Sequence, residues 1–129
     1  MMLSMIRATS LDTALGTTFS NGREAGRADT TPDKGGSGQG FRPHDLLEAA
    51  LATCIHMTLR AYARSHGIPL EDVEVVVALD RRPEETLFRY SLDLKGPLSA
   101  EDVDHLHRAA AACPGKSTLS KPLRFEAAP

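Results

Sequence analysis

One run of sequence governs the rest of this chain: Arg42-Pro43-His44-Asp45-Leu46-Leu47-Glu48-Ala49-Ala50-Leu51-Ala52-Thr53-Cys54-Ile55-His56-Met57-Thr58-Leu59-Arg60. Apolar or small residues recur in it every three or four positions, which is the spacing of a helix face. Between Glu48 and Arg60 no side chain carries a formal charge, so the helix is apolar on nearly all sides. We therefore predict a central helix that other parts of the molecule must cover.

The two ends of this helix carry the expected start and stop signals. Pro43 suits a first helical turn, and Asp45 and Glu48 place negative charge near the positive end of the helix dipole. A glycine directly after His66, followed by Pro69, is typical of a helix end. We expect the helix to stop near His66.

Before the central helix the sequence predicts a β-hairpin. Thr17-Thr18-Phe19-Ser20 runs into the pair Asn21-Gly22, and both residues of that pair tolerate the positive φ of a hairpin turn. This places Arg23 and Arg27 on or just after the turn. Residues 30–40 are rich in glycine and predict a loop that leads into the helix.

After the central helix, two runs have the pattern of antiparallel strands with one solvated face, Val73–Asp80 and Phe88–Lys95. Ser99 resembles an N-cap for a second helix that ends at Cys113. Leu123–Ala127 alternates between apolar and polar residues and predicts a last strand. The order of elements predicts an α+β fold.

Length and composition narrow the classes of function. The 129 residues fit one domain, which we expect to span residues 1–129. The net charge of -2 and the interleaved charges offer no surface for nucleic acid. No signal peptide and no run of membrane-spanning length is apparent. We expect a soluble, cytoplasmic protein that binds neither nucleic acid nor membrane.

The two cysteines are the candidate chemistry. In a reducing compartment such a pair is more often reactive than a permanent staple, although two small core residues remain the alternative. A thiolate at Cys54, in the middle of a helix, would need a positive charge delivered from elsewhere, and Arg23 or Arg27 is of the right type. Cys113 directly precedes Pro114, where we expect a turn and a more open environment.

The histidines suggest no second kind of site. His56 lies two positions from Cys54 and therefore points away from it on a helix, so a Cys-His nucleophile pair is not expected. His105 and His107 cannot share a helix face, and no histidine spacing fits a metal site. We expect neither a metal nor a cofactor.

Two motifs resemble the OsmC/Ohr family. Gly40 to Cys54 is similar to its Gly-x-x-Pro start and Ala-rich helix with a central cysteine. Cys113-Pro114-Gly115-Lys116-Ser117-Thr118-Leu119 is similar to its second motif, Cys-Pro followed by Thr-Leu. The resemblance extends from about Asn21 to Phe125. It implies a homodimer of α+β subunits and a peroxidase for organic hydroperoxides, with Cys54 as peroxidatic and Cys113 as resolving cysteine.

The chain departs from that family at the partner of the activating arginine. Peroxidase members commonly carry a glutamate after the proline of the first motif, where this chain has His44. Asp45 or Glu48 could serve instead. By motif position Arg23 is the better match to the family's hairpin arginine, and Arg27 is the fallback.

Two hypotheses follow. In the first, the chain is a thiol-dependent peroxidase that a dithiol reductant restores after each turnover. In the second, the missing glutamate marks a non-catalytic relative that serves as a small-ligand-binding or dimerisation module. In either case an Ala-rich helix that is apolar on nearly all sides needs cover from a partner subunit, so we expect an intertwined homodimer with Cys54 close to the interface.

Overall fold

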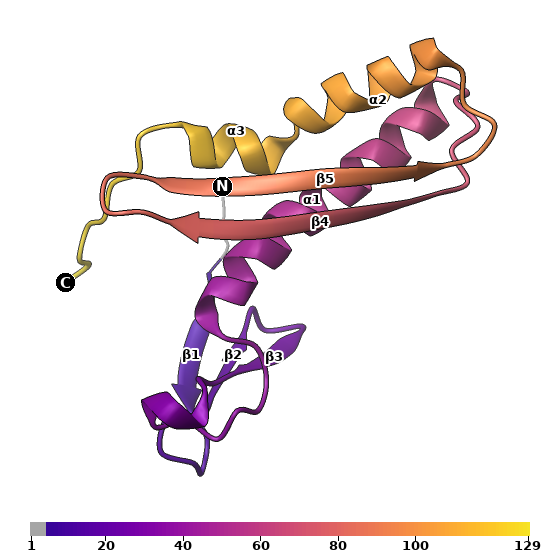
Figure 1. Cartoon of the computed structure of the whole chain (residues 1–129). Helices are drawn as coiled ribbons and strands as arrows, with labels where there is room; N and C mark the ends of the chain where they lie inside the picture. Colours follow the sequence, from indigo (N-terminus) through magenta and orange to yellow (C-terminus); the bar gives the residue numbers. More distant parts are fainter. Residues whose placement is uncertain (1–4) are drawn as a thin grey trace. The chain divides into compact units, whose positions relative to one another are not determined.

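A computed structural model describes residues 5–129 as a mixed α+β chain (Figure 1). Its elements are β1 (Arg7–Ser10), β2 (Thr17–Ser20), β3 (Ala25–Ala28), η1 (Pro32–Lys34), α1 (Pro43–Ser65), β4 (Asp72–Arg81), β5 (Thr86–Lys95), α2 (Ala100–Ala111) and α3 (Pro114–Ser120). They form two compact units, Met1–Leu47 and Glu48–Pro129, which are described separately. The predicted α+β class is confirmed, and one domain over residues 1–129 stays a prediction.

The first unit contains the predicted hairpin. β2 and β3 pair antiparallel, and Ser20 faces Ala25 across the turn. The Asn21 side-chain oxygen accepts hydrogen bonds from the backbone N–H groups of Arg23 and Glu24, both at 2.9 Å. Gly22 takes a φ of 96°, as the Asn-Gly signal requires. β1 adds a third strand beside β2 that the sequence did not predict, because its residues are all exposed and carry no apolar alternation.

α1 begins at Pro43 and ends at Ser65, as its predicted start and stop signals require. Its buried residues form a single stripe, Leu51, Ile55, Leu59 and Ala63. The opposite side of the helix stays exposed in the second unit, at Ala50, Thr53, Met57 and Ala61. Although α1 has 23 residues, no helix within residues 5–129 is both long and apolar enough to cross a membrane.

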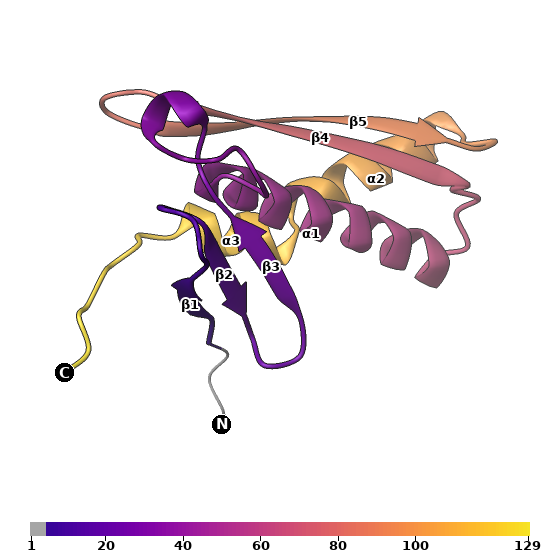
Figure 2. The ribbon, with the colours of Figure 1, turned by 90° about the horizontal axis from the view of Figure 1, so that it is seen from below.

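β4 and β5 form a two-stranded antiparallel sheet with one solvated face, as predicted. Val75 lies opposite Leu92 and Val77 opposite Tyr90, and all four contact the core cluster around α1 and α2. The alternate residues point to solvent, as the exposed Glu74 illustrates. The helices of this unit all lie on the same side of the sheet (Figures 1 and 2).

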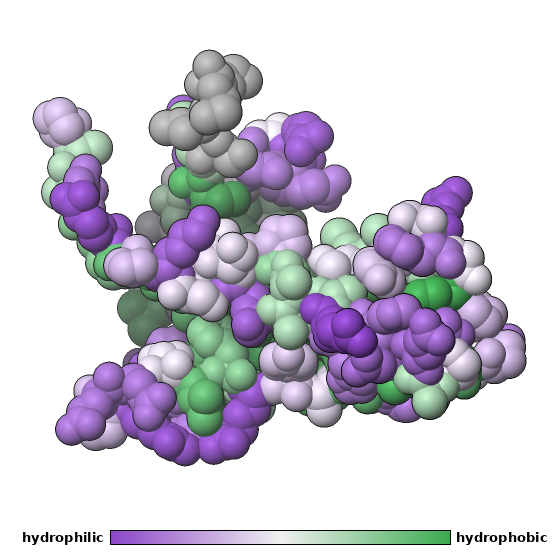
Figure 3. Space-filling model, turned by 90° about the horizontal axis from the view of Figure 1, so that it is seen from above, coloured by the Kyte–Doolittle hydropathy of each residue, from purple (hydrophilic) through white to green (hydrophobic). Residues whose placement is uncertain are grey.

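α2 begins with the predicted N-cap. The Ser99 hydroxyl accepts from the Asp102 N–H, and the Asp102 carboxylate accepts from the Ser99 N–H, which is a reciprocal cap. Leu106 and Ala110 are fully buried. The outer surface of α2, on the right in Figure 3, is mostly hydrophilic, so α2 is an amphipathic helix covering the core from one side.

The structure corrects the predicted C-terminal region in two places. The turn expected after Cys113 is the helix α3, which Pro114 begins and the Cys113 side chain caps. The predicted strand Leu123–Ala127 is wrong, because residues 121–129 have no regular structure and Phe125 is 94% exposed. A strand requires hydrogen bonds to a neighbouring backbone, and none of the strands within residues 5–129 pairs with this segment.

Candidate functional site

The two cysteines meet at the first turn of α3. The Gly115 N–H donates to the Cys54 sulfur at 3.2 Å, and the N–H of the next residue, Lys116, donates to the Cys113 sulfur at 3.3 Å. Both cysteines are free thiols. The fold therefore brings a mid-helix cysteine of α1 and the cap residue of α3 to one short backbone segment.

The two thiols differ in environment. Cys54 is half-buried, whereas Cys113 is fully buried. Burial raises the pKa of the Cys113 thiol, the neighbouring Cys54 thiol adds to this rise, and the hydrogen bond from the Lys116 N–H opposes it. The more open environment expected for Cys113 is wrong, because its side chain turns inward to cap α3. Of the two residues, only Cys54 is partly exposed.

Gly115 is part of this site and was missed by the sequence reasoning. A Cβ atom at this position would lie 3.2 Å from both the Cβ and the Sγ of Cys54. A glycine directly after Cys-Pro marks a position beside the second cysteine, but nothing in the sequence places it next to Cys54. The sequence predicts that a cationic side chain supports a Cys54 thiolate, whereas in the structure a backbone N–H donates to its sulfur.

The candidate arginines both belong to the first unit. Arg23 lies in the turn between β2 and β3, Arg27 lies in β3, and both are exposed. Within residues 5–47 neither guanidinium makes a hydrogen bond or an ion pair. Because the thiols belong to the second unit, the role of either arginine at Cys54 stays a prediction.

The two candidate carboxylates have local partners. The Arg42 side chain and backbone N–H hydrogen-bond to Asp45 at 2.8 to 3.3 Å, and this hydrogen bonding lowers the pKa of the Asp45 carboxyl. The Glu48 carboxylate accepts from the Leu79 N–H at 2.8 Å, which joins α1 to the free edge of β4. Both carboxylates therefore have contacts other than an arginine of the hairpin.

A hollow of about 200 Å³ lies between α1, β5 and α3, and neither cysteine lines it. Its walls include Leu51 on α1, Phe88 and Tyr90 on β5, and Lys116 and Leu119 on α3. Leu51 would be 3.9 Å from a Cβ at Gly115, so the hollow begins next to the residue that contacts Cys54. Its walls combine apolar and aromatic side chains with the polar side chains of Thr86, Lys116 and Ser120.

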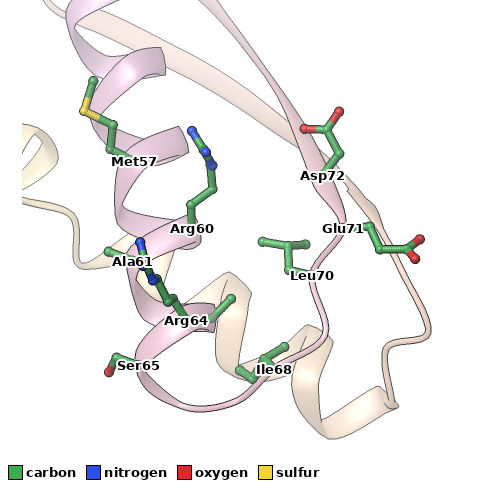
Figure 4. Close-up of a pocket in the computed structure, with 10 residues that line it drawn as sticks. Met57, Arg60, Ala61, Arg64, Ser65, Ile68, Leu70, Glu71 and Asp72 are labelled. Atoms are coloured by element: carbon green, nitrogen blue, oxygen red, sulfur yellow. The ribbon is translucent and has the colours of Figure 1, made fainter.

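A larger hollow, of about 710 Å³, lies away from the thiols (Figure 4). It runs along the C-terminal half of α1 and is closed on the other side by residues 68–72. Met57, Arg60, Ala61 and Arg64 face it from the helix, and Leu70 lies opposite. No cysteine lines it, so we assign it no part in thiol chemistry.

Comparisons with known proteins identify the family and the fold of this chain. Residues 36–128 match the family model described as OsmC-like protein. Similar solved structures include an OsmC-like protein from Mycoplasma pneumoniae, with 19% sequence identity, a TM-score of 0.75 and coverage of 92% of this chain and 87% of that one. No curated protein matches the chain in sequence.

Two further solved structures carry a functional name. One is an organic hydroperoxide resistance protein OsmC from Legionella pneumophila, with 22% identity, a TM-score of 0.64 and coverage of 92% of this chain and 90% of that one. The other is an organic hydroperoxide resistance protein from Elizabethkingia anophelis, with 16% identity, a TM-score of 0.70 and coverage of 93% and 89%. At these identities the likeness establishes the fold.

Proposed function

The chain belongs to the OsmC-like protein family, and we propose that it is a thiol-dependent peroxidase that reduces organic hydroperoxides. The observation that carries this proposal is the pair of free thiols held by consecutive backbone amides of α3, one half-buried and one fully buried. Two of the structures it resembles are named for organic hydroperoxide resistance, which supports the choice of substrate.

Cys54 is the proposed peroxidatic residue. Its thiolate attacks the distal oxygen of the hydroperoxide, the S–O bond forms as the O–O bond breaks, and the organic fragment leaves as an alkoxide that takes up a proton to become the alcohol. The sulfur is then a sulfenic acid, oxidised by two electrons. The half-buried position of Cys54 suits this encounter with an organic peroxide better than the full burial of Cys113.

Cys113 is the proposed resolving residue. Its sulfur attacks the sulfenic sulfur, a disulfide forms, and the sulfenic hydroxyl leaves with a proton as water. A dithiol reductant then restores both thiols by exchange and itself becomes a disulfide. The neighbouring Cys54 thiol contributes to the raised pKa of Cys113, which supports the closeness of the two sulfurs.

Arg23 is the proposed activating residue. A guanidinium near the Cys54 sulfur would favour the thiolate and stabilise the leaving alkoxide. Arg23 is exposed and makes no hydrogen bond or ion pair through its guanidinium within its own unit, so it is available for such a contact. Arg27 is the fallback for the same role.

A homodimer is the proposed assembly. The exposed side of α1 includes Met57, which is 65% exposed, beside the hollow drawn in Figure 4. Burying this side against a second copy would remove apolar surface from water. An intertwined dimer with Cys54 near the interface and a cytoplasmic location both stay predictions.

The proposal is tested by counting thiols after cumene hydroperoxide is added in a stopped-flow instrument. The unaltered protein should lose two thiols per peroxide, Cys113→Ser should consume one equivalent and accumulate sulfenic acid, and Cys54→Ser should consume none. Reaction in Cys54→Ser would reverse the two roles. No loss of thiol at millimolar peroxide would instead favour a non-catalytic ligand-binding or dimerisation module.

A further inference from the structure

Gly115, in the first turn of α3, is in direct contact with Cys54. Its N–H donates to the Cys54 sulfur at 3.2 Å, and the site of its absent Cβ is 3.2 Å from both Cβ and Sγ of Cys54. We propose that Gly115 is a positioning residue for Cys54, whose missing side chain lets α3 bring a backbone donor onto the reacting sulfur. This inference rests on the proposed function, in which Cys54 is the thiol that reacts.

Local backbone geometry does not explain a glycine here. Six other glycines of the described chain have a positive φ, but Gly115 does not, so an L-residue could adopt its conformation. Gly115 also lies in the first turn of α3, and glycine is among the poorest helix formers. Space beside Cys54 is the remaining reason for a glycine.

The space between position 115 and Cys54 is too small for an added methyl group unless one of its neighbours moves. A contact of 3.2 Å is shorter than a comfortable separation of about 3.5 to 4.0 Å between carbon atoms. An alanine at position 115 would therefore move α3 or the Cys54 side chain by a few tenths of an ångström. That movement lengthens the hydrogen bond from the residue 115 N–H to sulfur, and weakens it.

The hydrogen bond matters because of where Cys54 lies. The N–H groups in the interior of α1 are engaged in the helix itself, so a sulfur at mid-helix depends on donors from other elements. A hydrogen bond to the charged form of a group favours that form. The Gly115 N–H is thus a built-in donor for the Cys54 thiolate, additional to any arginine.

The test measures the reactivity of Cys54 alone. In a Cys113→Ser background Cys54 is the only cysteine of the chain, and serine preserves a good cap for α3. Gly115→Ala is added to this background, with Ser117→Ala as the matched control, because Ser117 is exposed on the same helix. The rate of alkylation by iodoacetamide is followed by mass spectrometry across a range of pH.

We expect Gly115→Ala to move the pH midpoint of alkylation upward by up to about one unit, which lowers the rate at neutral pH by up to about tenfold. Ser117→Ala should leave the profile unchanged. An unchanged profile in a folded Gly115→Ala protein, with folding checked by circular dichroism, overturns the inference. An equal shift in Ser117→Ala overturns it as well, since the effect would then belong to the helix as a whole.

A second measurement covers the case in which Gly115→Ala does not fold. In the Cys113→Ser protein, the NMR resonance of the Gly115 amide proton should move with pH at the same midpoint as the alkylation of Cys54. A resonance that does not move at that midpoint overturns the inference. Peroxide consumption is measured separately, so a protein with the expected alkylation shift but no peroxidase activity retains this inference and refutes the proposed function.

Discussion

Removing the Glu48 carboxylate tests whether this residue is structural or serves the thiols. Its Oε2 atom accepts from the Leu79 N–H at 2.8 Å, and Leu79 faces Phe88 in the β4–β5 pairing. The contact therefore fastens α1 to the edge of β4. If this is its role, substitution should lower stability and leave the reactivity of Cys54 unchanged.

The size of the effect follows from the kind of contact. A hydrogen bond to a charged group contributes about 1.5–3 kcal/mol, and Glu48→Ala also leaves the half-buried Leu79 N–H without this acceptor. The higher helix propensity of alanine offsets a few tenths of a kcal/mol of this loss in stability. We expect Glu48→Ala to lower the free energy of unfolding by about 2 kcal/mol, and Glu48→Gln by about 1 kcal/mol because a neutral acceptor remains.

The assay is urea unfolding followed by circular dichroism, paired with alkylation of Cys54. Glu74→Ala is the matched control, because Glu74 is an exposed glutamate of β4 whose removal should change stability by less than about 0.5 kcal/mol. The structural role is refuted if Glu48→Ala is as stable as Glu74→Ala. Slower alkylation in that stable variant would assign Glu48 to the activating arginine instead.

Three further predictions concern the arginine, the assembly and pH. Arg23→Lys should slow Cys54 alkylation and Arg23→Ala should slow it more, since an ammonium is a poor substitute for a guanidinium. Slower alkylation in Arg27→Ala alone would assign the activating role to Arg27. Unchanged alkylation in the variants of both arginines would show that the hairpin does not activate Cys54. Sedimentation at micromolar concentration should find a dimer, which Met57→Lys weakens at least about tenfold by burying an unpaired charge; a stable monomer contradicts this. Burial raises the pKa of Cys113 above its ordinary 9.0, so the protonated thiol stabilises the folded protein below that pH, and this stabilisation is lost as pH rises past it. Under reducing conditions, the free energy of unfolding should therefore fall less in Cys113→Ser than in the unaltered protein as pH rises past 9.0. An equal fall in the two proteins would contradict this.

Local signals in the sequence were sufficient for most of the fold. The apolar spacing of α1, the turn chemistry of Asn21-Gly22 and the alternation of β4 and β5 each depend on neighbours within a few positions. The cap of α2 at Ser99 is equally local. Such features can be predicted because the residues that stabilise them are also the residues that encode them.

The parts that were missed depend on contacts between distant positions. α3 has only seven residues, and its cap is a cysteine whose preference for that role is not apparent from sequence. The contact between Gly115 and Cys54 joins residues from two helices, so no spacing rule could predict it. The strand expected at Leu123–Ala127 failed for the same reason, because alternation alone does not supply a neighbouring strand.

The unequal burial of the two thiols favours a fixed order of events. Cys113 is fully buried and its raised pKa keeps it protonated at neutral pH, so it is a poor first nucleophile for a peroxide. Cys54 is half-buried and receives a backbone donor on its sulfur. Once Cys54 is a sulfenic acid, the sulfur of a nearby thiol can displace its hydroxyl, which leaves with the thiol proton as water. The proposed asymmetry of roles therefore follows from one structural cause, the inward turn of Cys113 that caps α3.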